Sequence, residues 1–96
     1  MKRLTVVATV VAKADKIEEV KTELNRLIEP TRKEEGCINY DLHQSKEDQA
    51  IFIFHENWTS EAHLDAHLET DHIKTCQAAL EDIIESAVVH KLYQIA

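Results

Sequence analysis

Two histidines, His67 and His72, are the side chains of this sequence best suited to chemistry, and they lie five residues apart. Imidazole titrates near neutral pH, so it can take a proton from a bound hydroxyl group or polarise a developing oxyanion. On one continuous α-helix the two side chains would point about 140° apart. A break in the helix near Asp71 would bring them together as a proton-transfer pair. The alternative is that they hydrogen-bond backbone groups beneath the helix junction.

A third histidine, His63, precedes His67 by four residues, a spacing at which two histidines can bind one metal ion. The segment lacks the glutamate of the metalloprotease motif, and His63 is expected to point into solvent. We therefore predict no metal site.

The strands before this helix supply candidates for holding a substrate. By alternation, His55 and Asn57 share one face of an expected strand, and Asn39 lies on a face of the neighbouring strand that is similarly polar. These polar groups would bind a substrate or else satisfy one another. Trp58, on the face opposite Asn57, and Tyr40 are candidate walls of an aromatic cavity, with ordinary core packing as the alternative.

The hydrophobic pattern predicts four strands and two helical regions. Strands are expected over 4–12, 37–45, 50–58 and 87–95. A helix capped by Asp15 is expected to bend at Pro30 and to end in a left-handed cap at Gly36. A second helical region begins after the cap residue Ser60 and carries apolar residues as far as Ile84.

The resulting order is β-α-β-β-α-β in a single domain over residues 1–96. Two right-handed crossovers place both helical regions on the same side of a four-stranded antiparallel sheet, which is the ferredoxin-like α+β fold. Several strands are nevertheless apolar on both faces. We therefore predict a homodimer in which the second sheet face packs against that of another copy, as in a dimeric α+β barrel.

Charge and composition exclude several classes of binding partner. The formal charge of −7 argues against nucleic acid and against an anionic membrane surface, and no apolar run approaches membrane-spanning length. We expect a cytoplasmic protein. The two cysteines, Cys37 and Cys76, show no metal or redox spacing, and the single glycine leaves no phosphate loop or dinucleotide fingerprint, so no cofactor is predicted.

The segments 36–43 (Gly-Cys-Ile-Asn-Tyr-Asp-Leu-His) and 56–62 (Glu-Asn-Trp-Thr-Ser-Glu-Ala), followed by His67 and His72, resemble the antibiotic biosynthesis monooxygenase (ABM) family. The resemblance covers nearly the whole chain and implies a dimeric α+β barrel. The family includes cofactor-independent oxygenases of aromatic polyketides, quinol oxidases, haem-degrading enzymes and an isomerase for the phosphorylated signal autoinducer-2.

Differences from the haem-degrading branch make that activity improbable here, because the first strand lacks its asparagine and the matching helix positions hold His67 and Gln77. The segment 67–76 looks closest to the quinol-oxidising and signal-processing branches. The resemblance thus implies a cofactor-independent monooxygenase of a quinol or another enolisable small molecule, using dioxygen, with His67 and His72 catalytic. The alternatives are an isomerase or degradation enzyme for a small phosphorylated signal, and a dimer that only binds a small ligand.

Overall fold

The computed structural model describes residues 3–96. Four strands and four short helices follow one another in the order β-α-α-β-β-α-α-β, so each predicted helical region consists of two helices. Their bounds are β1 Leu4–Ala12, α1 Ile17–Asn25, α2 Ile28–Arg32, β2 Cys37–Gln44, β3 Ile51–Trp58, α3 Glu61–Leu68, α4 Asp71–Leu80 and β4 Ile84–Leu92.

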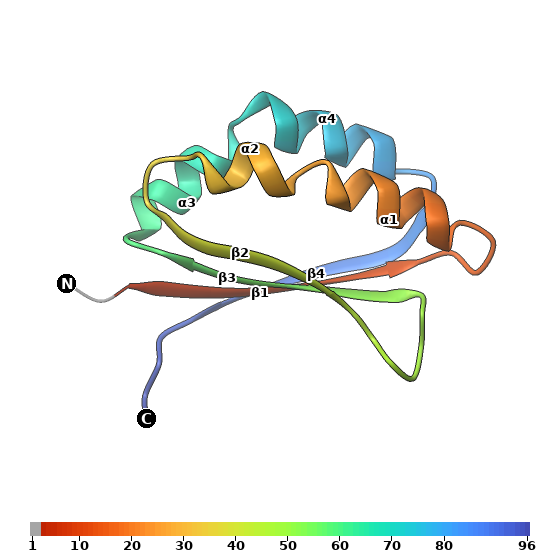
Figure 1. Ribbon diagram of the computed structural model, residues 1–96, viewed down its shortest axis with the longest axis horizontal. Helices are drawn as coiled ribbons and strands as arrows, with labels where there is room; N and C mark the ends of the chain where they lie inside the picture. Colours follow the sequence, from red (N-terminus) through yellow and green to blue (C-terminus); the bar gives the residue numbers. More distant parts are fainter. Residues whose placement is uncertain (1–2) are drawn as a thin grey trace.

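The four strands form one antiparallel sheet in the order β2-β3-β1-β4. Figure 1 shows all the helices on one face of this sheet, while the segment after β4 leaves toward the other face. The core lies between the sheet and the helices, and its buried members include Val6, Val10, Val20, Leu24, Phe52, Phe54, Trp58, Leu64, Ile73, Cys76 and Leu80. The predicted ferredoxin-like α+β fold is confirmed.

The first helical region differs from its prediction in two details. Pro30 lies inside α2, and the break falls earlier, at Arg26 and Leu27. A proline ring collides with the carbonyl group four residues before it, here that of Arg26, so the helix is interrupted one turn ahead of the proline. The predicted cap was also wrong, because α1 begins after Lys16 without a side-chain cap bond and Asp15 does not cap it.

Gly36 forms the turn into β2 and has a φ of 84°. Its predicted left-handed conformation is confirmed, although α2 has already ended at Arg32. A Cβ atom on residue 36 would lie 2.2 Å from Cγ of His63, so His63 packs over this glycine and is half-buried, not directed into solvent as expected. The carbonyl of Gly36 accepts the Thr59 N–H at 2.9 Å, which ties the start of β2 to the end of β3.

The last strand, β4, covers Ile84–Leu92, so its first and its last residue both lie three positions earlier than in the predicted range 87–95. Pairing with β1 explains the shift. Ala12, the last residue of β1, lies opposite Ile84, so Ile84 begins the strand instead of continuing α4. At the other end Thr5 lies opposite Leu92, and little of β1 remains for later residues to pair with.

The sheet face that carries no helix, which we term the open face, is apolar at its centre. Its apolar side chains alternate with the core residues and are half-buried or exposed: Val7, Val11, Ile51, Ile53 and Val88. Soluble monomers rarely leave a contiguous apolar patch of this kind facing water. Among residues 3–96, no helix is long and apolar enough to cross a membrane.

Candidate active site

The short connection between α3 and α4 brings His67 and His72 to one place. Thr70 organises it, because its hydroxyl donates to the carbonyl of His67 at 2.7 Å and accepts the N–H of Ile73 at 3.4 Å, which caps α4. The helix break predicted near residue 71 is therefore confirmed. The centroids of the two imidazole rings lie 6.1 Å apart, and each ring reaches toward the same acidic group.

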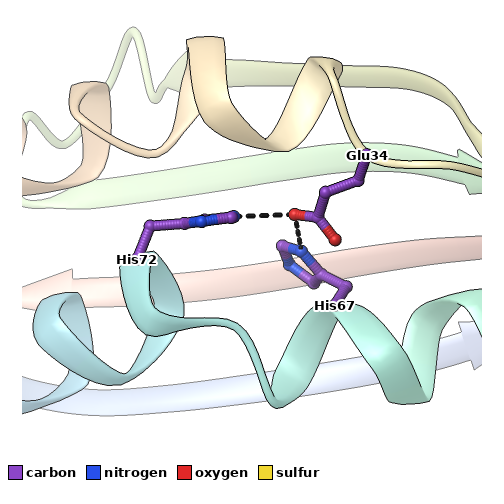
Figure 2. A group of neighbouring side chains, drawn as sticks. All are labelled: Glu34, His67 and His72. Atoms are coloured by element: carbon purple, nitrogen blue, oxygen red, sulfur yellow. Dashed lines mark hydrogen bonds and ion pairs between the residues drawn. The ribbon is translucent and has the colours of Figure 1, made fainter.

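That group is Glu34, in the segment between α2 and β2, and the sequence analysis did not identify it. Its Oε2 lies 2.7 Å from Nδ1 of His67 and 2.7 Å from Nε2 of His72. Figure 2 shows both rings directed at this one oxygen. A carboxylate only accepts hydrogen bonds, so each imidazole donates from the nitrogen named. In its neutral form His67 therefore carries its proton on Nδ1, and Nε2 is left as an acceptor.

The surroundings of His67 favour the neutral imidazole. Its side chain is 3% exposed, and its ring centroid lies 4.8 Å from that of Trp58 and 5.6 Å from that of Tyr40. Burial lowers the pKa of His67, and the Glu34 carboxylate opposes this shift without cancelling it. A carboxylate in this position fixes the tautomer and stabilises the imidazolium that forms when the ring accepts a proton. A neutral imidazole held in this way has Nε2 as the nitrogen that can accept a proton.

A cavity of about 200 Å³ lies beside His67, between the sheet and the helices. Most of its wall is apolar, and its polar members are Tyr40, Glu56, His67, Gln77 and Lys91. It opens along β4, where Val89 lines it and is 59% exposed. An engineered cavity of about 150 Å³ in another protein accommodates benzene, so this volume suits a molecule with a single ring.

Glu56 is a second acidic side chain of the site. It shares the helix-facing side of β3 with Trp58, is 4% exposed, and its Oε1 accepts the indole N–H of Trp58 at 2.9 Å. Burial raises the pKa of Glu56 to about 7, although the bond from Trp58 opposes the shift. A carboxyl group with such a pKa is partly protonated at neutral pH and can donate a proton into the cavity.

Two of the predicted substrate-binding residues, Trp58 and Tyr40, lie on the same side of the sheet as His67. Tyr40 lines the cavity, whereas Trp58 is completely buried and packs against the His67 ring. Burial raises the pKa of Tyr40 far above its ordinary value, so its hydroxyl group stays protonated. It can therefore donate a hydrogen bond but does not act as a phenolate.

The other three, Asn39, His55 and Asn57, lie on the open face. Oδ1 of Asn57 accepts the Thr5 hydroxyl at 2.6 Å, and its amide donates to Oδ1 of Asn39 at 2.8 Å. Asn39 in turn donates to Asp41 and to the carbonyl of His55, both at 3.1 Å. The amide groups of Asn39 and Asn57 are thus hydrogen-bonded on the open face, and within one chain the sheet separates all three residues from the cavity.

Comparisons with known proteins agree with this architecture. The sequence model of the antibiotic biosynthesis monooxygenase family matches residues 3–79. The uncharacterized protein sll1783 of Synechocystis sp. is 31% identical over 93 residues, which are 97% of this chain and 63% of that protein. YcnE of Bacillus subtilis, described as a candidate monooxygenase, is 30% identical over 79 residues, which are 82% of this chain and 83% of YcnE.

A solved structure extends the match to the whole chain. The crystal structure of PA3566 from Pseudomonas aeruginosa has a TM-score of 0.96 and 33% identity, and the alignment covers 100% of this chain and 97% of PA3566. The family match alone already includes Glu34, Glu56, His67 and His72. By sequence and by fold, the chain belongs to the antibiotic biosynthesis monooxygenase family.

Proposed function

We propose that the protein is a monooxygenase that oxidises a quinol or another small enolisable aromatic molecule without a cofactor. The observation that carries the proposal is the Glu34–His67 pair beside an apolar cavity of single-ring size. Family membership and the likeness to YcnE support an oxidoreductase. Neither identifies the substrate. The quinol is what the resemblance of segment 67–76 to the quinol-oxidising branch implies, and a cavity of single-ring size is compatible with it.

The proposed reaction begins with proton transfer to His67. Nε2 accepts the proton of a bound phenolic hydroxyl, and Glu34 stabilises the imidazolium ion that forms. The resulting quinolate is electron-rich and reduces dioxygen. One oxygen atom bonds to a ring carbon, and the other leaves as water with two hydrogens from the substrate, so that quinol and O₂ give hydroxyquinone and water.

The other cavity residues have supporting roles in this scheme. Protonated Glu56 donates to the reduced oxygen as the O–O bond breaks, while Tyr40 helps to wall the ring. His72 does not line the cavity. It holds Glu34 in place by donating to the same oxygen that His67 uses, so it positions the base instead of reacting itself.

The test is oxygen-dependent turnover of a panel of quinols and polyphenols. We expect one O₂ consumed per quinol converted, incorporation of one ¹⁸O atom from ¹⁸O₂ into the product, and no conversion under anaerobic conditions. Conversion that continues at the same rate without oxygen would contradict the monooxygenase.

A second candidate is an isomerase of a small phosphorylated ketose-like signal. It is favoured by one observation, namely that a base and a protonated acid, His67 and Glu56, line the same cavity. His67 would remove a proton next to a carbonyl group, and Glu56 would return one to the neighbouring carbon. This reaction consumes no oxygen and would incorporate solvent deuterium into recovered product, which distinguishes it from the oxidation.

We further propose that two chains associate through the open face. Pairing would remove its central apolar side chains from water, and the Thr5–Asn57–Asn39 hydrogen bonds would leave few polar groups unsatisfied at the contact. Asn39, His55 and Asn57 would then lie in the interface. Any contact they make with substrate would be to a molecule held between the subunits.

Replacing Ile53 with aspartate tests the dimer. This side chain is at the centre of the open face, so a buried charge there is expected to convert the dimer into monomers at micromolar concentration. Sedimentation velocity measures the change. Ala78→Asp, on the exposed side of α4, is the matched control and should leave the dimer intact. A wild-type chain that sediments as a monomer would contradict the proposal.

A further inference from the structure

The Glu34–His67–His72 cluster also has the composition of a metal-binding site. One possible ligand atom from each of Glu34, His67 and His72 lies within 4.8 Å of the other two. Two imidazoles and one carboxylate form the donor set with which proteins bind Zn²⁺ in hydrolases and Fe²⁺ in oxygenases, with further positions left open. Glu34, His67 and His72 come from three segments of the chain, so they lie together only in the folded protein.

The distances leave room for an ion after small side-chain movements. In a tetrahedral site with bonds near 2.1 Å, neighbouring ligand atoms lie about 3.4 Å apart. Each nitrogen is now 2.7 Å from the Glu34 oxygen, so the rings need to retreat from it by less than about 1 Å. The ligand atoms lie within 4.8 Å of one another, so the two nitrogens need to approach each other by at most about 1.4 Å. Such a shift is within the reach of rotations about the side-chain bonds.

The charge of the cluster favours a cation. Within residues 3–96, the ion-pair partners of Glu34 are the two imidazoles, and it makes no salt bridge to lysine or arginine. Its side chain is only 14% exposed, so its negative charge is poorly screened by water. Burial is the main cause of the raised pKa values of Cys37 and Glu56, and the charge of Glu34 adds to both shifts.

An ion can reach the cluster from solvent through His72. This side chain is 25% exposed and lines an open groove between α1 and α4. The charged side chains that line the groove are Glu23, Arg26 and Asp71, and Arg26 is paired with Glu23 at 2.9 Å. The positive charge of Arg26 is therefore paired and does not repel a metal ion that approaches His72 along the groove.

We propose that Glu34, His67 and His72 bind one divalent transition-metal ion of the Zn²⁺ class, which replaces the two hydrogen bonds to Glu34. Binding moves protons without releasing them. The metal takes Nδ1 of His67, whose proton passes to Nε2, and it takes Nε2 of His72, whose proton passes to Nδ1.

Metal binding has a consequence that rests on the proposed function. Once Nε2 of His67 carries the proton, it donates instead of accepting and can no longer take a proton from substrate. The metal would therefore inhibit turnover by changing the tautomer of the base, with no need to occupy the cavity. The site would make the enzyme sensitive to free transition-metal ions.

The test uses Co²⁺ as a spectroscopic probe and untagged protein freed of metal with EDTA. We expect one Co²⁺ per chain, with the intense visible absorption of a tetrahedral nitrogen and oxygen site, and displacement of Co²⁺ by Zn²⁺. Glu34→Gln and His72→Ala should each weaken binding at least about tenfold, since each removes a ligand. Glu35→Gln, at an exposed position next to Glu34 in the chain, is the matched control and should bind as the wild type does.

Two outcomes would overturn the metal site: no stoichiometric binding by the wild type, or unchanged binding by both Glu34→Gln and His72→Ala when circular dichroism shows that they are folded. Zn²⁺ should also inhibit turnover over the same concentration range in which it binds. If the ion binds through these residues and turnover is unaffected, the metal site stands and the assignment of His67 as the base fails.

Discussion

Replacing His67 with glutamine is expected to lower kcat/KM by at least about 100-fold, which is the lower end of what a general base contributes. Glutamine keeps an N–H that can reach Glu34 but has no basic nitrogen at the position of Nε2. The side chain is buried against Trp58, so a polar residue of similar size preserves the packing better than alanine does. Steady-state oxygen uptake with the best quinol measures the effect.

Substitution of His72 should lower kcat/KM by an intermediate amount. His72→Ala removes a group that holds Glu34 but does not line the cavity, so its loss of kcat/KM should be smaller than that of His67→Gln. Glu35→Gln, at an exposed position outside the open face, should have no effect. Full activity in the His67→Gln enzyme would remove this residue from the mechanism.

The second large effect is on stability and concerns Glu56. Its pKa is about 7 in the folded protein and 4.5 ordinarily, so the folded state holds this proton more tightly than the unfolded chain does. The free energy of unfolding therefore falls as pH rises from 4.5 to 7, and the loss is complete above 7. The expected size of the loss is about 3 kcal/mol.

Glu56→Gln should remove this dependence. Glutamine is neutral at every pH and can still accept the indole N–H of Trp58, so the variant should match the wild type at pH 4 and exceed its stability by about 3 kcal/mol at pH 8. Urea unfolding at several pH values measures the difference. The lowered pKa of His67 destabilises the fold at acidic pH in both proteins and cancels in the comparison. Glu85→Gln, at an exposed strand position, is the control, and parallel pH curves for wild type and Glu56→Gln would refute the assignment.

Periodicity was sufficient to predict the fold and part of the site. Alternation in β3 correctly separated Asn57 from Trp58, and helical spacing showed that His67 and His72 could meet only across a break. The element ends were less predictable. The start of β4, for instance, depends on pairing between Ala12 and Ile84, which local sequence does not specify.

The two acidic residues of the site were missed for different reasons. Glu34 lies in a charged connecting segment, where neither alternation nor helical period applies, and its role arises only when α3 and α4 fold against it. Glu56 was visible in the sequence, two residues before Trp58 on the same strand face. That spacing carries a signal, because a glutamate on the buried face of a strand requires a partner.

The central claim is that Glu34 holds His67 as a neutral base with its proton on Nδ1. Nuclear magnetic resonance of ¹⁵N-labelled histidine in EDTA-treated protein tests it directly, because protonated and unprotonated ring nitrogens have well-separated chemical shifts. At pH 7 we expect His67 to be neutral, with Nδ1 protonated and Nε2 unprotonated. A His67 that is positively charged at pH 7, or that carries its proton on Nε2, would contradict the account.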